Sequence, residues 1–229
     1  MTSGIILGKN KVSNEMLTEL TCYKQDTDLQ TIFESIFVSS EKSMDSVCLL
    51  SGFMPKVEEF LHNQTFAAAV DFPYGLSTTQ VRLHEAILAI RSGAKIIDIV
   101  LNSFDIKNEN WKGIRQDLRA CKALCDQNDV KLRPILEYRL FEVDKIVHLC
   151  ETLERLRLFE IVNSTGTILD DVSENAAMSY IIQRQTSLSV VSCSPILNSE
   201  HYNVFKEMGI YGVRFKSPAI ADNILSDGV

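Results

Sequence analysis

Short apolar segments alternate with longer amphipathic segments along almost the whole chain, and this alternation limits the folds that the sequence can adopt. Eight segments read as strands, and they cover residues 17–23, 46–50, 65–71, 96–101, 132–136, 158–162, 188–193 and 212–215. Nearly every one is followed by a segment with helical periodicity. Regular alternation of this kind gives parallel strands joined by right-handed crossovers. We therefore predict a single (β/α)8 TIM barrel, with a doubly wound open sheet as the rival.

The rival fold is disfavoured because no glycine-rich dinucleotide turn follows an early strand. A chain of 229 residues can build one large core. We predict one domain over residues 1–229, in which residues 1–16 form an N-terminal extension. A helix is also predicted for residues 55–62, between the second and third strands.

Charge and cysteine content exclude several classes of protein. The formal net charge of −7 argues against nucleic acid as a partner, because that partner selects a basic surface. No apolar run is long enough to cross a membrane, and the N-terminus does not resemble a secretory signal. Six cysteines without a secretory signal indicate reduced thiols, so we predict a cytoplasmic protein.

The carboxyl ends of barrel strands carry function in this fold, so the residues there are the candidates for a site. Polar or ionisable residues near these predicted ends are Glu19, Cys48, Asp71, Asp98, Glu137, Asn163, Ser192, Arg214 and Lys216. Asp98 lies within an otherwise apolar strand, where an ionised carboxylate is costly unless it is hydrogen-bonded or has a chemical task. Proton transfer at the barrel mouth and a structural role as a satisfied core aspartate both fit this position.

Several motifs in order along the chain resemble those of the 2-deoxyribose-5-phosphate aldolase family. The matching segments read AVDFPYG at 69–75, TTQV at 78–81, GAKIIDIV at 93–100, PILE at 134–137 and STG at 164–166. Together with Val47 and Cys48, the resemblance spans roughly residues 17–225. It implies the barrel fold and a common origin.

The resemblance also implies class I aldolase chemistry, in which a lysine on the sixth strand forms a Schiff base and a second lysine on the seventh lowers its pKa. The family aspartate corresponds to Asp98. Aligning the STG segment places Val162 at the position of the first lysine. Residues 190–195 fall where the family has a lysine followed by a Gly-Gly turn, which places Val191 at the position of the second. Valine has no nucleophile, so both lysines are predicted to be missing.

The candidate substrate contacts are Cys48, Glu137, Ser164, Thr165 and Gly166, which lie in matching motifs, and Lys216, which lies close to the barrel mouth. The paired glycines that hold phosphate in the family are replaced by Ser194 and Pro195, and proline offers no N–H donor. No cofactor and no metal are expected. A class II, metal-dependent aldolase is disfavoured because the four histidines do not form a ligand cluster.

We therefore predict a degenerate aldolase homologue without aldolase activity, retained for binding, regulation or assembly. Its partners would be a small phosphorylated ligand, a second copy in a homodimer, or another protein in a hetero-complex. The alternative is an enzyme of altered chemistry that uses Asp98, Glu137 and Lys216, with Cys48 in support. A third reading is an aldolase that uses a different lysine, such as Lys95 or Lys131, although Lys95 stands at the wrong end of its strand.

Overall fold

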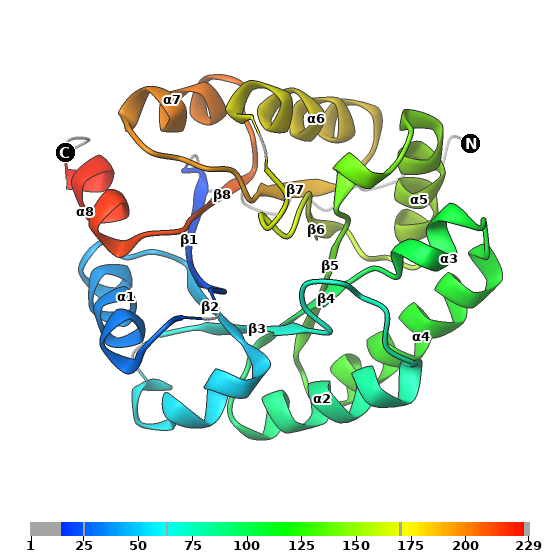
Figure 1. Ribbon diagram of the computed structural model, residues 1–229, viewed down its shortest axis with the longest axis horizontal. Coiled ribbons are helices and arrows are strands. Elements are labelled where there is room, and N and C mark those ends of the chain that lie inside the picture. Colours follow the sequence, from blue (N-terminus) through cyan, green and yellow to red (C-terminus); the bar gives the residue numbers. More distant parts are fainter. Residues whose placement is uncertain (1–14, 25, 63, 170, 227–229) are drawn as a thin grey trace, which may run out of the picture.

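Eight parallel strands close into a barrel in chain order, as the alternation predicts (Figure 1). We analysed a computed structural model, which describes residues 15–24, 26–62, 64–169 and 171–226. The predicted N-terminal extension lies almost wholly outside the described residues. The strands are β1 (Leu17–Cys22), β2 (Ser46–Leu50), β3 (Phe66–Val70), β4 (Ile96–Val100), β5 (Lys131–Ile135), β6 (Glu160–Val162), β7 (Ser189–Ser192) and β8 (Gly212–Phe215).

Helices surround the barrel and cover the outward-facing side chains of the strands (Figure 1). They are α1 (Leu29–Glu41), α2 (Thr79–Arg91), α3 (Ser103–Lys107), α4 (Trp111–Gln127), α5 (Val143–Arg155), α6 (Val172–Gln185), α7 (Ser199–Glu207) and α8 (Pro218–Ser226). The last helix, α8, packs beside the first, α1. The large core between strands and helices is built mainly from Ile, Leu, Val and Ala side chains. No helix in the described ranges is both long and apolar enough to cross a membrane.

The helix predicted for residues 55–62 is wrong. Two short 3₁₀ turns stand there instead, η1 (Ser51–Lys56) and η2 (Glu58–Phe60). Pro55 lies inside η1, where it has no N–H to donate to a helical ladder, so a regular α-helix is disfavoured. The surface between α1 and α2 is therefore covered by turns rather than by a helix. A third turn, η3 (Tyr138–Leu140), and the short helix α3 were not predicted from the sequence.

Three residues that follow barrel strands have a positive backbone φ angle. Asp71 directly follows β3 and Glu137 is the second residue after β5, and both adopt positive φ, which is uncommon for residues other than glycine. Gly166, after β6, also has positive φ, at +70°. A side chain at Gly166 would collide with Lys216 and Cys193, whose atoms lie within 3 Å of where its Cβ would be. Glycine is therefore required at this turn.

Candidate active site

Four charged side chains meet in the interior of the barrel: Glu19, Asp98, Arg133 and Arg214. All four are essentially inaccessible to water. Arg133 donates from Nε to Oδ1 of Asp98 at 2.7 Å and from Nη1 to Oε1 of Glu19 at 2.9 Å. Arg214 donates from Nε to Oε2 of Glu19 at 2.8 Å and from Nη2 to Oδ2 of Asp98. Each carboxylate therefore binds both guanidinium groups, and the four formal charges sum to zero.

Strand register explains why these four side chains meet. Glu19 on β1 is the direct partner of Arg214 on β8, and Asp98 on β4 is the direct partner of Arg133 on β5. Neighbouring residues in register project to the same side of a sheet. Each pair combines one carboxylate with one guanidinium group. The two pairs project inward from different parts of the sheet and meet in the centre of the barrel. Arg133 also bonds Glu160 on β6 at 3.0 Å.

The opposite charges within this cluster stabilise the ionised forms of Glu19, Arg133 and Arg214. Burial by itself raises the pKa of Glu19, but Arg133 and Arg214 outweigh that effect and hold its pKa well below the usual value. Burial likewise opposes protonation of both arginines, yet the adjacent Asp98 raises the pKa of each above its ordinary value. Glu19, Arg133 and Arg214 are consequently ionised throughout the neutral pH range.

Asp98 was predicted from the sequence as the residue for proton transfer, and its contacts in the structure are those of a structural anion. Its two oxygens accept from Arg133, from Arg214 and from the hydroxyl of Tyr23, the last at 3.3 Å. A general acid or base needs an oxygen that can reach a substrate proton. In this arrangement both oxygens of Asp98 are already occupied by protein donors.

Cys48 lies against the same cluster. Its Sγ approaches Oε2 of Glu19 at 3.5 Å, and the residue is completely buried. Burial, with Glu19 and Asp98 adding to it, raises the pKa of the Cys48 thiol well above its ordinary value. A thiol that stays protonated is a poor nucleophile. The structure therefore places Cys48 in the interior packing rather than at an open substrate position.

The two valines at the predicted lysine positions lie side by side. Val162 on β6 is the direct register partner of Val191 on β7, and Ile135 on β5 is the partner of Val162. With Val100 and Cys193 they form one buried cluster, which we call the apolar layer. Each member is at most 2% exposed.

On β4 and β5, the apolar layer lies nearer the carboxyl ends of the strands than the charged cluster does. Val100 follows Asp98 by two residues and Ile135 follows Arg133 by two, so in each strand the apolar residue projects inward one step nearer the carboxyl end. The predicted lysine positions, 162 and 191, are thus occupied by completely buried valine side chains. The other lysines considered, Lys95 and Lys131, stand at the amino ends of β4 and β5, and Lys131 is paired with Glu160.

The Ser164–Thr165–Gly166 turn follows β6 and was predicted to bind substrate. Its backbone N–H groups already have partners within the protein. Thr165 N donates to Oε2 of Glu137 at 2.9 Å, and Gly166 N donates to Oγ of Ser164 at 3.2 Å. Thr167 N donates to Oγ1 of Thr165 at 3.2 Å. An anion cradle uses free N–H groups, and these three are engaged.

Lys216 does lie beside this turn. It directly follows β8, is partly buried, and its Nζ donates to the carbonyl oxygen of Gly166 at 2.8 Å. The structure thus brings together Glu137, Lys216 and the turn at the barrel mouth. Asp98 belongs to the charged cluster and Cys48 lies against it, so the predicted site residues fall into two groups.

The Glu137 contact predicts a measurable stability effect. Replacing Glu137 by Ala removes the acceptor for Thr165 N–H and Oγ1–H, both of which are buried. A buried donor without a partner costs about 1–3 kcal/mol. We expect urea denaturation to show a loss of this size, whereas Glu142→Ala, at an exposed helix N-cap that makes no side-chain bond, should change stability by less than about 0.5 kcal/mol. Equal effects of the two substitutions would contradict the assigned contact.

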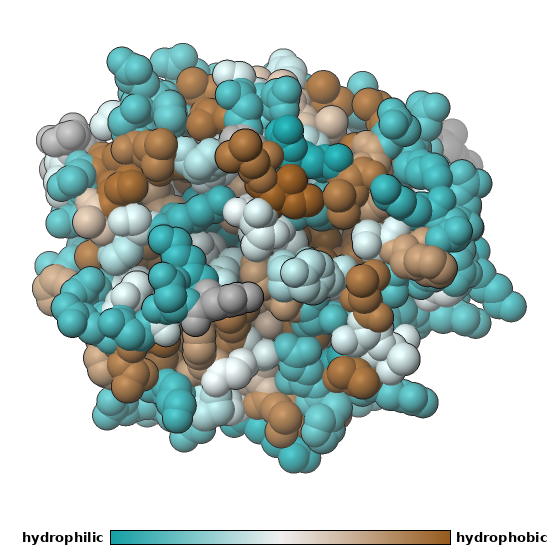
Figure 2. Space-filling view, viewed as in Figure 1, coloured by the Kyte–Doolittle hydropathy of each residue, from teal (hydrophilic) through white to brown (hydrophobic). Residues whose placement is uncertain are grey.

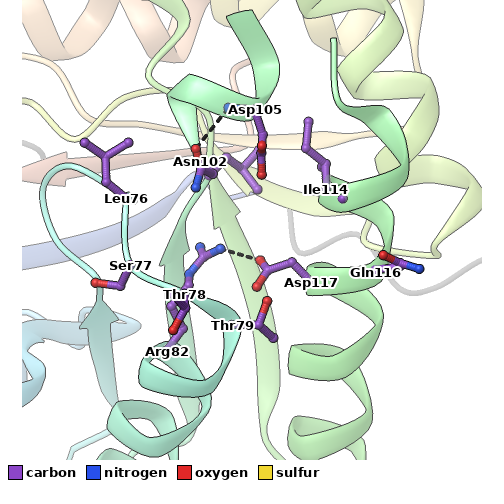
Figure 3. Close-up of a pocket in the computed structure, with 12 residues that line it drawn as sticks. Leu76, Ser77, Thr78, Thr79, Arg82, Asn102, Asp105, Ile114, Gln116 and Asp117 are labelled. Carbon is purple, nitrogen blue, oxygen red and sulfur yellow. Dashed lines mark hydrogen bonds and ion pairs between the residues drawn. The ribbon is translucent and has the colours of Figure 1, made fainter. Parts of the chain in front are cut away.

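Sequence reasoning missed Arg82 and the structural role of Asn163, two buried polar residues that hold the strand ends in place. Asn163 donates to Ser179 at 2.9 Å and accepts from Cys193 N at 2.9 Å, which ties β6, β7 and α6 together. Arg82 on α2 bonds Asp117 on α4 (Figure 3), and it also donates to the carbonyl oxygen of Val100. The signal for both was a polar residue at an inward helical or strand position, but their partners are far away in sequence.

Arg82 and Asp117 line a cavity of about 350 Å³ between α2 and α4, together with residues of the β4–α3 connection (Figure 3). This cavity lies outside the barrel axis. It contains no residue of the charged cluster or of the Ser164–Thr165–Gly166 turn. It is therefore separate from the position where aldol chemistry would take place.

Comparison with known proteins supports the resemblance. The DeoC/LacD family aldolase pattern matches residues 6–141, more than half of the chain. The deoxyribose-phosphate aldolase of Histophilus somni (strain 2336) is 31% identical over 151 residues, and that of Mannheimia succiniciproducens is 32% identical over 151 residues. In both cases the match spans 65% of this chain and 65% of the relative, slightly less than two thirds of each.

Solved structures share the fold at low sequence identity. The deoxyribose phosphate aldolase from Aeropyrum pernix, described as having a unique tetrameric structure, superposes with a TM-score of 0.81 at 14% identity and covers 94% of this chain and 91% of its own. An aldolase named QR15 superposes with a TM-score of 0.79 at 21% identity, covering 93% and 95%. The family pattern ends before β6, and positions 162 and 191 lie beyond it. On the strength of residues 6–141, this chain belongs to the DeoC/LacD family of aldolases.

Proposed function

We propose that this chain is a DeoC/LacD-family barrel that does not catalyse Schiff-base aldol cleavage and that acts by binding another protein. One observation carries the proposal. Val162 and Val191, which the family resemblance aligns with the two lysines, are register partners within the apolar layer. Neither residue offers a nucleophile or a titratable proton, so the imine route has no starting point there.

Two further features support the loss of aldol chemistry. Both oxygens of Asp98 are held by Arg133 and Arg214, which leaves no acceptor aimed at a substrate. The N–H groups of the Ser164–Thr165–Gly166 turn are bonded within the protein, so a phosphate would have to displace Glu137 or a hydroxyl to reach them. The six cysteines are free and buried, which fits a location in the cytoplasm, where thiols stay reduced.

Borohydride trapping tests this proposal. The chain is incubated with deoxyribose 5-phosphate or acetaldehyde, reduced with borohydride and weighed by mass spectrometry, beside the Histophilus somni relative as a positive control for the assay. We expect an adduct on the control protein and an unchanged mass for this chain. A stoichiometric adduct on a lysine of this chain, with release of glyceraldehyde 3-phosphate from deoxyribose 5-phosphate, would refute the proposal.

A second candidate function rests on Lys216, whose amine lies at the barrel mouth 2.8 Å from the Gly166 carbonyl. In that function Lys216 replaces the missing lysine in altered carbonyl chemistry, or binds an anionic ligand. The same trapping experiment on Lys216→Ala separates the two functions. An adduct that the parent chain forms and this variant does not would favour the second, whereas no adduct on either favours the first.

A further inference from the structure

A contiguous apolar strip runs along the outer surface of the barrel. Leu29, Phe33 and Phe37 on α1 are 51%, 38% and 66% exposed. They are spaced four residues apart, so they project from one side of the helix. Phe60 of η2 extends the strip sideways, because its ring centroid is 5.2 Å from that of Phe33. We call these four side chains, three phenylalanines and one leucine, the aromatic strip.

Leu29, Phe33 and Phe37 are exposed and lie outside the buried core, whereas Phe60 is partly buried and packs against it. The inward face of α1 is formed by other residues, among them Ile32 and Ile36, which are fully buried. Isolated exposed apolar residues are ordinary, but a contiguous group of them indicates a surface that binds something. The strip borders η2, one of the two 3₁₀ turns that stand where a regular helix was expected.

Carboxylates border the aromatic strip on both sides. Glu34 and Glu41 lie on the exposed face of α1, and Glu58 and Glu59 precede Phe60 in η2. All four are exposed, and none forms an ion pair within the described part of the chain. Residues 29–41 and 51–60 contain these four acids and a single basic residue, Lys56. In Figure 2, brown side chains at the lower edge of α1 are bordered by teal ones.

We propose that the aromatic strip binds a basic amphipathic helix of a partner protein. Apolar side chains on one face of such a helix would pack against Phe33, Phe37 and Phe60. Lys and Arg on either side of that face would meet the four glutamates. A second copy of this chain fits less well, because two-fold pairing through the strip would bring the glutamates of both copies together. The surface lies outside the barrel, so this proposal stands whether or not the interior is catalytic.

The probe for this proposal is a synthetic amphipathic peptide of about 14 residues built from Leu and Lys, long enough to form a helix when bound. Its fluorescence anisotropy is titrated with the full chain, and a Leu–Glu peptide of the same pattern serves as the charge control. We expect Phe37→Ser to weaken binding of the Leu–Lys peptide about tenfold or more, as loss of a central aromatic anchor does. Phe104→Ser, which alters an equally exposed phenylalanine on α3, should leave binding within about twofold.

The charges give an independent readout. The combined variant Glu34→Gln and Glu41→Gln should weaken binding of the Leu–Lys peptide and reduce its salt dependence, because rim charges act through screened electrostatics. Circular dichroism on each variant checks that the fold is intact. Three results would overturn the proposal: equal losses from Phe37→Ser and Phe104→Ser, equal binding of the acidic and basic peptides, or a concentration-dependent dimer in sedimentation that Phe37→Ser abolishes.

Discussion

Replacing Glu19 by Gln is expected to destabilise the protein by about 3–5 kcal/mol at pH 7, the range seen when one partner of a buried ion pair is removed. Glu19 accepts from Arg133, from Arg214 and from Ser46, and no water reaches any of these atoms. Glutamine keeps one acceptor oxygen but turns an NH₂ group toward a guanidinium. Chemical denaturation gives the free energy of unfolding, and Asp126→Asn, which breaks an exposed i,i+4 pair, should cost less than about 1 kcal/mol.

The same substitution has a defined pH dependence. The pKa of Glu19 is lowered in the folded protein, so its contribution is complete above the unfolded value, about 4.5, and is lost as pH falls through the folded value. We therefore expect the difference in unfolding free energy between the parent chain and Glu19→Gln to be constant from about pH 6 to pH 8. Below about pH 4.5 it should shrink. A difference that is small at pH 7, or that grows in acid, would contradict the ionised cluster.

Replacing Val162 by Lys is expected to damage the fold without restoring the chemistry. The longer side chain overfills a completely buried position, which costs about 1–3 kcal/mol. Removing its ammonium group from water shifts the pKa downward by as much as about 3–5 units, at about 1.4 kcal/mol per unit. The destabilisation should fall at high pH, where lysine is neutral in both the folded and unfolded states. Val81→Lys, at a half-exposed position on α2, should change stability by less than about 0.5 kcal/mol.

Activity measurements on Val162→Lys test whether a substrate can reach position 162 within the apolar layer. With Asp98 held by two arginines, we expect neither borohydride trapping of an adduct nor cleavage of deoxyribose 5-phosphate, even though the nucleophile has been restored. The double variant Val162→Lys with Val191→Lys should be less stable still. If Val162→Lys folded with unchanged stability and formed an imine, the apolar layer would have to open readily, and the argument for lost chemistry would fail.

The barrel could be predicted from the sequence because each strand and each helix has its own periodicity. The strand order needed no further information, since right-handed crossovers between successive parallel strands permit only sequential pairing once the sheet closes. The segment after β2 was predicted incorrectly. Its apolar residues resemble a helix in spacing, but Pro55 favours two 3₁₀ turns, and local sequence does not reveal how short the connection will be.

The charged cluster could be anticipated only in part. Asp98 stood out because a carboxylate within an apolar strand needs a partner. The partners Arg133 and Arg214 also lie within apolar strands, and each points inward by the two-residue alternation. Pairing them correctly requires the register between strands that are 35 and 116 residues apart, which local patterns do not contain. The internal bonds of the Ser164–Thr165–Gly166 turn likewise depend on Glu137, which the family motif marked as a substrate contact.

The arrangement of the charged cluster links the two ends of the barrel sheet. Glu19 is on the first strand and Arg214 on the last, at the seam where the sheet closes on itself, while Asp98 and Arg133 come from adjacent strands in the middle of the chain. Before β8 is in place, two interior acids share one arginine of the cluster. The charges in the core balance only after the last strand has docked, so a chain that ends early, or that inserts β8 out of register, carries an uncompensated negative charge at the centre of its own core.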